Sequence, residues 1–409
     1  MVYNQLNNEQ MMELSNKRIL LGVSGSIAAY KSAELVRLLR KQGAEVRVVM
    51  TSTATEFVQP LTFQALSGNI VYSAWDDADR GDGMGHIELA RWADAIVIAP
   101  ASADLLARLR QGMADDLLTT LCLASDSILA VAPAMNRLMW ENAATKENMA
   151  VLQERGLNIM GPGSGGQACG EVGLGRMLEP EQLVHEIAGL FTTGVLSGTK
   201  LLLTAGPTRE AIDAMRFLSN RSSGKMGYAL AQAATEAGAD VTLVSGPVSL
   251  DTPPRVKRLN VSSASEMYEC VMAEAPANDV FISAAAVADY RPANPSKEKV
   301  KRKDENIDLS LTQNRDIVAS VTALTNKPFT VGFAAETADV ELHAKSKLER
   351  KRLDMIAANQ VGGGAGAEVD ENEMTLYWAD GSQHLAKTSK HKLARQMVAI
   401  IGEHYRAKA

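Results

Sequence analysis

One local pattern occurs twice in this chain: a short apolar run that breaks into a glycine-containing loop and continues as a helical pattern. The first copy begins at Arg18 and its loop spans Gly22–Ser26; the second begins at Leu201, about 180 residues further on. In α/β proteins a strand, a glycine loop and a helix N-terminus present backbone N–H groups to a phosphate. The repetition therefore predicts two nucleotide-type modules in tandem.

The spacing of the other apolar runs agrees with two domains. A chain of 409 residues is longer than a single core usually organises. Val/Ile/Leu runs alternate with helical stretches on both sides of the small-residue segment 192–199, as in parallel sheets that helices cover on both faces. We expect two tandem three-layer α/β domains, residues 1–190 and 191–409.

The expected strands of the first domain are 18–23, 45–50, 94–99, 127–132 and 157–160, and its expected helices are 27–41, 105–111, 117–124 and 181–190. The expected strands of the second domain are 201–204, 241–244, 279–284, 329–333, 355–358 and 375–378, and its expected helices are 228–237, 264–274, 340–351 and 390–405. Between these elements, the lysine-rich segment 287–306 is predicted to be a mobile loop.

Composition excludes several classes of protein. A formal net charge of −6 argues against a general nucleic-acid or anionic-membrane binder. No apolar run approaches the length of a membrane span, and the first residues lack a signal-peptide core. The three cysteines form neither a metal-binding spacing nor a disulfide framework. We expect a cytoplasmic protein with free thiols.

The first glycine loop suits a single phosphate. Its glycines, Gly22 and Gly25, do not make the dinucleotide fingerprint, and the second strand ends without the acidic residue that would bind a ribose diol. The hydroxyls of Ser24 and Ser26 beside a helix N-terminus favour a phosphate monoester. An ordinary βα turn is the alternative.

Other candidate segments follow the later strands of the first domain. Pro100–Asp104 and Pro133–Trp140 come directly after strands, where ligands bind in open α/β sheets. Asn136 could equally cap a helix, and Met139 with Trp140 could belong to the core. His86 is an isolated histidine in a glycine-rich loop, a position that is more often structural than catalytic. The glycine-rich segment 161–177 reads as a functional loop or flap.

Taken together, these segments resemble known families. GVSGSIAAYK, MGHIELA, PASAD, PAMNRLMW and ACGEVGLGRM resemble the flavin-dependent cysteine decarboxylases, and phosphopantothenoylcysteine decarboxylase in particular. TAGPTRE, RFLSNRSSGKMG, AAAVADYRP, EKVKRK and GFAAET resemble phosphopantothenate–cysteine ligase. Their order resembles the bifunctional coenzyme A biosynthesis proteins of bacteria. This implies a flavodoxin-like decarboxylase domain followed by a Rossmann-like ligase domain.

For the first domain the resemblance implies FMN as cofactor, which oxidises the thiol carbon of the substrate so that the adjacent carboxylate leaves as carbon dioxide. The implied FMN-binding residues are Gly22, Ser24, Gly25, Ser26, Pro100, Ala101, Ser102 and Ala103. His86 is implied as the base, Asn136 as a donor to the substrate carboxylate, Met139 as a substrate contact and Cys169 as the proton donor to the product. Asp104 departs from the asparagine that many of these decarboxylases carry.

For the second domain the resemblance implies CTP, used with Mg²⁺ to form an acyl-cytidylate that the cysteine amine then attacks. The implied CTP-binding residues are Asp289, Lys299, Arg315, Asp316, Ile317, Val318, Phe333, Lys347 and Lys351. Asn220 and Lys299 are implied as catalytic and Arg216 as substrate-binding, with no metal ligands assigned. The alternative for the three lysines is a solvated charged helix or loop face. Arg315 departs from the usual proline.

The implied partners are the small molecules 4′-phosphopantothenate, cysteine and CTP, without nucleic acid or membrane. The resemblance also implies a homo-oligomer built from decarboxylase trimers and ligase dimers. Two rival functions stay open at this point. A halotolerance-type regulatory flavoprotein would usually carry an acidic tail, and an NAD(P) oxidoreductase would need the missing fingerprint and acid.

Overall fold

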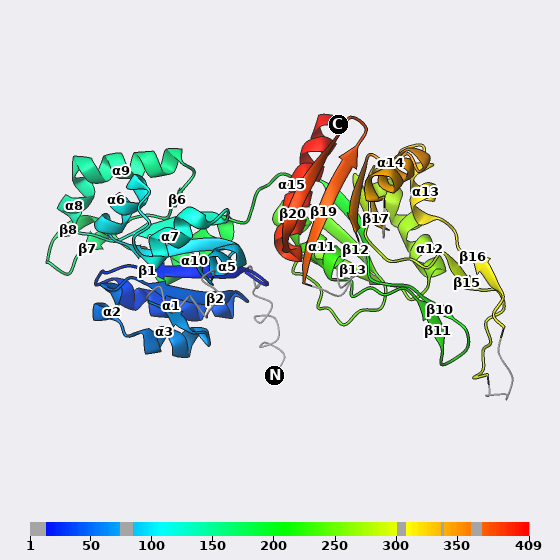
Figure 1. The fold of residues 1–409 in the computed structure, drawn as a ribbon, viewed down its shortest axis with the longest axis horizontal. Helices are drawn as coiled ribbons and strands as arrows, with labels where there is room; N and C mark the ends of the chain where they lie inside the picture. The colour runs from blue at the N-terminus through cyan, green and yellow to red at the C-terminus, as the bar shows by residue number, and fades with distance from the viewer. Residues whose placement is uncertain (1–13, 74–84, 301–307, 337–338, 361–369, 409) are drawn as a thin grey trace, which may run out of the picture. The chain divides into compact units, whose positions relative to one another are not determined.

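The chain divides into two compact α/β units, Met1–Phe191 and Thr192–Ala409 (Figure 1). The computed structural model describes residues 14–73, 85–300, 308–336, 339–360 and 370–408. Each unit is built on one sheet that helices cover on both faces. The predicted fold class, two tandem three-layer α/β domains, is therefore confirmed.

The first unit contains a six-stranded parallel sheet in the order β3-β2-β1-β4-β5-β6. Chain order reverses between β1 and β4, so this sheet is doubly wound with a central switch point. The strand order of flavodoxin, 2-1-3-4-5, is doubly wound in the same way, with its switch point between the first and third strands. The strands are β1 (Arg18–Val23), β2 (Glu45–Met50), β3 (Val71–Tyr72), β4 (Ala95–Ala101), β5 (Ile128–Pro133) and β6 (Asn158–Ile159). A separate hairpin consists of β7 (Gly163–Gly166) and β8 (Val172–Arg176).

Helices pack on both faces of this sheet because alternate strand residues point to opposite sides. On one face Leu21 and Val97 pack with residues of α1, α3 and α10; on the other Leu20 and Ile96 pack with residues of α5, α6, α7 and α9. The described helices are α1 (Ala29–Lys41), α2 (Ala54–Phe57), α3 (Pro60–Ser67), α5 (Gly85–Trp92), α6 (Ala103–Gln111), α7 (Leu117–Ala124), α8 (Arg137–Glu141), α9 (Ala143–Glu154) and α10 (Pro180–Gly189).

The second unit has an eight-stranded sheet in the order β13-β12-β9-β14-β17-β18-β19-β20. The strands from β13 to β18 pair in parallel, whereas β19 pairs antiparallel with both β18 and β20. The strands are β9 (Lys200–Ala205), β12 (Asp240–Ser245), β13 (Val256–Asn260), β14 (Val280–Ser283), β17 (Phe329–Glu336), β18 (Met355–Gln360), β19 (Glu371–Trp378) and β20 (Gly381–Ser389). Two small hairpins are β10 (Arg209–Ala211) with β11 (Phe217–Ser219), and β15 (Tyr290–Pro292) with β16 (Leu311–Gln313).

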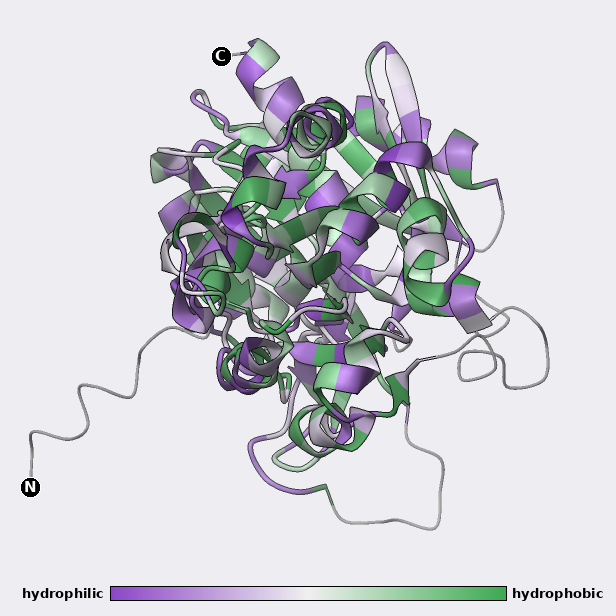
Figure 2. Cartoon of the chain, turned by 90° about the vertical axis from the view of Figure 1, so that its left-hand side faces the viewer, coloured by the Kyte–Doolittle hydropathy of each residue, from purple (hydrophilic) through white to green (hydrophobic). Residues whose placement is uncertain are grey.

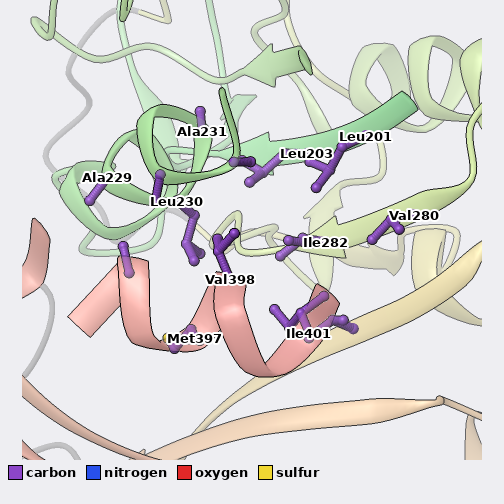
Figure 3. Packing of buried hydrophobic residues seen from close by; sticks show 14 of the residues in the cluster. Leu201, Leu203, Ala229, Leu230, Ala231, Val280, Ile282, Met397, Val398 and Ile401 are labelled. Atoms are coloured by element: carbon purple, nitrogen blue, oxygen red, sulfur yellow. The ribbon is translucent and has the colours of Figure 1, made fainter. Parts of the chain in front are cut away.

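The largest described core cluster of the second unit lies between one face of its sheet and the helices α11 and α15. Figure 3 shows Leu201 and Leu203 of β9 and Ile282 of β14 packed with α11 and α15, which contributes Met397 and Val398. Burial of each large apolar side chain contributes about 1.5–3 kcal/mol. The helices here are α11 (Lys225–Glu236), α12 (Ala264–Glu274), the 3₁₀ turn η1 (Ala275–Ala277), α13 (Ile317–Thr322), α14 (Val340–Arg350) and α15 (Lys390–Lys408).

Surface helices have one apolar face and one polar face. Figure 2 shows their colour alternating between hydrophilic and hydrophobic along the chain, as expected for elements that bury only one side. In the part of the chain that the structure describes, no helix has the length and apolar character needed to cross a membrane.

Candidate active sites

The two loops predicted to bind FMN meet at the switch point of the first sheet. Ser24, in the loop after β1, joins this loop to the end of β4, because its backbone N–H and hydroxyl both donate to the carbonyl oxygen of Pro100, at 3.2 and 2.8 Å. The same hydroxyl accepts from the N–H of Ser102 at 2.9 Å. Ligands of doubly wound sheets bind in this crevice, so the structure brings together the two predicted groups of residues.

The β1–α1 loop fits a phosphate through its backbone and through Ser26. A side chain at Gly25 would meet Thr53, because a Cβ there would lie 2.5 Å from a side-chain carbon of that residue. Ser26 is only partly buried and stands before α1, where its hydroxyl accepts from the N–H of Ala28 at 3.3 Å. Ser24, in contrast, is buried and its hydroxyl joins the two loops. A helix N-terminus with a hydroxyl is a suitable seat for the phosphate of a flavin nucleotide.

The start of α6 completes this edge of the sheet. Ser102 caps the helix, since its hydroxyl accepts from the N–H of Leu105 at 3.3 Å. Asp104 lies on the outer surface of α6 with its side chain 81% exposed, 4.0 Å from the guanidinium of Arg108. The carboxylate that replaces the expected asparagine therefore faces solvent and an arginine.

A flap crosses the carboxyl end of β5. The β7–β8 hairpin forms the flap, and it is attached where the N–H of Met135 donates to the carbonyl oxygen of Gly175 at 2.9 Å. Gly175 has φ of +127°, and a Cβ there would lie 2.4 Å from the carbonyl oxygen of Met135. Only glycine allows the flap to approach this closely.

The flap brings Cys169 to Asn136. The Oδ1 atom of Asn136 accepts from the N–H of Leu138 at 2.8 Å and caps α8, which leaves Nδ2 facing the flap. Nδ2 lies 3.3 Å from the Sγ atom of Cys169, 3.3 Å from Oε1 of Gln167 and 2.9 Å from Oε2 of Glu171. Two residues predicted to be catalytic are thus in contact, and Cys169 is exposed.

Met139 and His86, the other predicted site residues of the first domain, both lie on helices. Met139 is 49% exposed on α8, whereas its neighbour Trp140 is buried, so Met139 is available to a ligand. His86 was predicted to lie in a loop, and this was wrong: it is the second residue of α5, because Leu89 and Ala90 give this segment a buried face. Residues 83 and 84 of its motif lie outside the described residues.

The second site is at the switch point of the second sheet, between β9 and β14. The loops after these strands pair directly: Pro207 forms a bridge with Ala286, whose N–H donates to the carbonyl oxygen of Gly206 at 2.9 Å. Asn220 lies over the second loop, and its Nδ2 donates to the carbonyl oxygen of Val287 at 3.0 Å. The predicted catalytic amide therefore stands at the carboxyl ends of the strands.

A cavity of about 170 Å³ opens beside this switch point. Eight of the nine residues predicted to bind CTP line it: Asp289, Arg315, Asp316, Ile317, Val318, Phe333, Lys347 and Lys351. They come from the β14–β15 loop, the start of α13, β17 and the end of α14. The structure thus gathers residues that are up to about 60 positions apart in the sequence.

Two lysines make the cavity cationic. Lys347 donates through Nζ to the carbonyl oxygen of Phe333 at 2.7 Å, and burial together with the nearby Lys351 ammonium lowers its pKa. Lys351 forms an ion pair with Asp316 at 2.8 Å. Burial by itself would raise the pKa of Asp316, but the N–H of Ala319 and the ammonium of Lys351 together lower it. The cavity therefore combines an anion-attracting wall with an ionised carboxylate.

Arg315 and Asp316 shape the entrance of α13. The guanidinium of Arg315 lies over the ring of Tyr268, 5.1 Å from the ring centre. Asp316 caps the helix, as Oδ1 accepts from the N–H of Ala319 at 3.0 Å. An arginine is accommodated at this position because its cation stacks on an aromatic face.

Lys299 is the predicted CTP-binding residue that does not line the cavity. It is exposed, in segment 296–300, which attaches to the turn between β10 and β11 that holds Arg216. The prediction of a mobile loop over 287–306 was wrong for its first part, because Tyr290–Pro292 forms strand β15. Residues 301–306 lie outside the described residues.

Some residues at these sites were not predicted from the sequence. In the first unit they are Gln167 and Glu171, which contact Asn136 from the flap. In the second unit they include Ser283, Gln313 and Asn314, polar residues that line the cavity. The glycine-rich pattern could have indicated the two flap residues, since they are two of the few polar positions in segment 161–177. Within the described ranges, no group of three or more His, Cys, Asp and Glu side chains has an arrangement that could hold a metal ion.

Comparison with protein families assigns both units. Residues 7–192 match the model described as "Flavoprotein", and residues 196–405 match "DNA/pantothenate metabolism flavoprotein C-terminal domain". The first match supports the predicted flavin chemistry of the first unit at the level of the family. The second covers more than half of the chain.

Similar proteins align along nearly the full length. A protein of Vibrio vulnificus named "Coenzyme A biosynthesis bifunctional protein CoaBC" is 56% identical over 395 residues, 96% of this chain and 98% of that protein. Proteins with the same name from Escherichia coli and Bacillus subtilis are 49% and 45% identical, over 96% and 90% of this chain and 98% and 92% of theirs. A solved C-terminal domain of a protein of this name is 39% identical, with a TM-score of 0.46, covering 52% of this chain and 99% of that one.

Proposed function

The chain belongs to the family of bifunctional coenzyme A biosynthesis proteins, and from that premise we propose the reactions of its two halves. Residues 191–409 join cysteine to 4′-phosphopantothenate at the expense of CTP. Residues 1–190 then decarboxylate the resulting 4′-phosphopantothenoylcysteine to 4′-phosphopantetheine. The observation that carries the proposal is that predicted residues lie together at the carboxyl ends of strands in both units: the Asn136–Cys169 cluster lies beyond β5, and the lysine-lined cavity lies beside β14 and β17.

In the first half, FMN would be held by the β1–α1 loop and by Pro100–Ala103. When bound, it would supply the reversible two-electron oxidation of the cysteinyl carbon that makes loss of carbon dioxide possible. Asn136 presents Nδ2 toward the flap because its Oδ1 is fixed on α8, so the amide can donate to the substrate carboxylate. Cys169 lies 3.3 Å from that amide and can deliver a proton to the product carbon. His86 serves as the base.

In the second half, Lys347 and Lys351 offset the charge of the CTP triphosphate. The carboxylate of 4′-phosphopantothenate attacks the α-phosphorus, pyrophosphate leaves, and the acyl-cytidylate forms. Lys299 acts in that step. The cysteine amine then attacks the acyl carbon and releases CMP, while Asn220 orients the acyl carbonyl and Arg216 holds the intermediate. Mg²⁺ enters with CTP, since it is commonly bound through substrate phosphates and one or two carboxylates.

Three broader features complete the proposal. The protein acts in the cytoplasm on small molecules and assembles as a homo-oligomer, with trimers of the first half and dimers of the second. A regulatory flavoprotein of the halotolerance type is disfavoured, because residues 196–405 match the family model of a second domain, described as "DNA/pantothenate metabolism flavoprotein C-terminal domain". The oxidoreductase alternative is disfavoured by the flavoprotein match of the first domain.

The test uses the whole purified protein. With 4′-phosphopantothenate, cysteine and CTP together, we expect equal amounts of pyrophosphate and carbon dioxide, and a visible spectrum with the absorbance of oxidised flavin. Omission of CTP should stop both products, while addition of synthetic 4′-phosphopantothenoylcysteine should restore carbon dioxide alone. Pyrophosphate release without any carbon dioxide, or a colourless protein that does not take up FMN, would contradict the proposed first half.

A further inference from the structure

A buried carboxylate connects the two segments that carry Arg216 and Lys299. Asp213 lies in the turn between β10 and β11, and its side chain is 0% exposed. No residue of this turn lines the cavity that binds CTP in the proposed function, and Asp213 was not among the predicted residues. Figure 1 shows the β10–β11 and β15–β16 hairpins side by side in the second unit, and β10 contacts β15.

The two oxygens of Asp213 have different partners. Oδ1 accepts from the N–H groups of Met215 and Arg216, both at 2.8 Å, and so builds the turn. Oδ2 accepts from the guanidinium of Arg216, at 3.0 Å from Nε and 2.6 Å from Nη2. Oδ2 also accepts from the N–H of Val300 at 3.1 Å, a contact that spans 87 residues of sequence. Oδ1 therefore accepts hydrogen bonds within its own turn, whereas Oδ2 also connects the turn to a distant segment.

Both polar backbone groups of Val300 are bound by this pair. Its N–H donates to Asp213, and its carbonyl oxygen accepts from Nη2 of Arg216 at 3.1 Å. Four residues before Val300, the same segment is attached to the turn a second time, because the N–H of Ser296 donates to the carbonyl oxygen of Ile212 at 3.0 Å. Lys299 lies between these two attachments, so its backbone position is set by the turn.

Asp213 stays ionised at the pH values at which the protein would be assayed. Arg216 above all, with the N–H groups of Met215, Arg216 and Val300, holds the pKa of Asp213 well below its usual range. An ionised acceptor makes shorter and stronger hydrogen bonds than a neutral one. The connection between the turn and Val300 is therefore charge-assisted.

We propose that Asp213 is a positioning residue for the formation of the acyl-cytidylate: through Oδ2 it fixes Arg216 on Val300 and thereby places Lys299. Arg216 and Lys299 then act as one unit, set by a carboxylate whose two oxygens are both taken up by groups of the protein. This inference rests on the proposed ligase function and deepens it. A displacement of a reacting group by about 1 Å costs on the order of 100-fold in rate, which is the effect expected from its loss.

The substitution Asp213→Asn separates the two roles. An asparagine can keep its carbonyl oxygen at the Oδ1 position, where it accepts from Met215 and Arg216 and preserves the turn. Its amide NH₂ then stands at the Oδ2 position, where it faces the N–H of Val300 and the guanidinium, all of them donors. The connection to Val300 is lost although the local turn remains. Asp354→Asn is the matched control, because Asp354 is also a buried carboxylate that accepts from a backbone N–H and from two lysines, Lys327 and Lys408, and it lies at the amino end of β18.

Three measurements on the full-length protein test the proposal. In Asp213→Asn, pyrophosphate release in a single turnover should slow by about 100-fold, while the Kd for CTP stays within about twofold because the cavity is intact. Trypsin should cleave the Lys299–Val300 bond faster than in the parent protein. Asp213→Asn in a Lys299→Gln background should cause no further slowing, since both changes remove the same contribution. Asp354→Asn should leave all three quantities unchanged.

Two results would overturn the proposal. One is a normal rate of pyrophosphate release in Asp213→Asn, and the other is a slow rate without any change in cleavage at Lys299. Failure of the underlying ligase function has a different signature, because the unsubstituted protein would then release no pyrophosphate from CTP. The cleavage measurement needs no activity and still reports whether Asp213 holds the segment.

Discussion

At the scale of single residues, the proposed function predicts that the protonation state of Lys347 sets the pH dependence of CTP binding. Burial and the neighbouring Lys351 lower its pKa, so Lys347 loses its proton at a lower pH than an ordinary lysine. Because the charged form attracts the triphosphate, affinity for CTP should fall as the pH rises through this lowered pKa, by at most about tenfold per pH unit. Calorimetric titration between pH 7 and pH 10 measures this.

The control for that prediction is Lys347→Arg. A guanidinium keeps its proton throughout this range, so the variant should show a flatter pH profile than the parent protein, even if its affinity at pH 7 is lower. A profile that falls equally in both proteins would assign the titration to another group.

Cys169 carries a second prediction at this scale. Its thiol lies 3.3 Å from Nδ2 of Asn136 and belongs to the flap, which places it over the substrate in the proposed first half. A serine hydroxyl is a much weaker acid than a thiol. Cys169→Ser should therefore release one equivalent of carbon dioxide and then stop with the flavin reduced, as followed by trapped carbon dioxide and by the visible spectrum. Repeated turnover by this variant would show that another residue donates the proton.

At the scale of elements, apolar runs were predicted well and short polar strands were not. The expected strands 18–23 and 45–50 and the expected helices 117–124 and 264–274 agree with β1, β2, α7 and α12 because each has a continuous apolar run or a clear periodicity. The edge strand β13 and the hairpins β10–β11 and β15–β16 were missed. Their residues alternate weakly and are largely exposed, so tertiary pairing rather than local pattern makes them strands.

The two candidate sites likewise contain some contacts that could be predicted from the sequence and others that could not. The meeting of the loops after β1 and β4 was predictable, because strand ends of a parallel sheet share an edge. The contact between Asp213 and Val300 was not, since nothing in either local sequence indicates a partner 87 residues away. The same holds for the contact of Glu171 with Asn136, which depends on how the flap folds back over β5.

The flap gives a prediction about an element. Gly175 has φ of +127°, and a Cβ there would lie 2.4 Å from the carbonyl oxygen of Met135, so Gly175→Ala should force the flap off the end of β5. Decarboxylation should fall by at least tenfold while FMN binding persists, because the FMN-binding loops are elsewhere. Gly166→Ala is the control on the same hairpin, since a Cβ there would meet no atom within 4 Å. Equal activity of the two variants would contradict a role for flap docking.

At the scale of the whole molecule, the two units have separate cores and separate sites. Phe191, which the sequence-based boundary gave to the second domain, is buried in the core of the first, where the ammonium of Lys17 lies 4.6 Å from its ring centre. The first residue of the second core is Leu196. The structure therefore favours a division after Phe191.

Two fragments, 1–191 and 192–409, should accordingly fold alone, the first binding FMN and decarboxylating 4′-phosphopantothenoylcysteine, the second releasing pyrophosphate from CTP. Fragment 1–190 should be less stable than 1–191 by about 1.5–3 kcal/mol, the value of one buried aromatic side chain, because it lacks Phe191. Urea unfolding measures this difference, and fragment 1–192 serves as the control for chain length. If 1–190 and 1–191 unfold at the same urea concentration, Phe191 does not stabilise the first unit. If neither 1–191 nor 192–409 is active, each site depends on the other half of the chain.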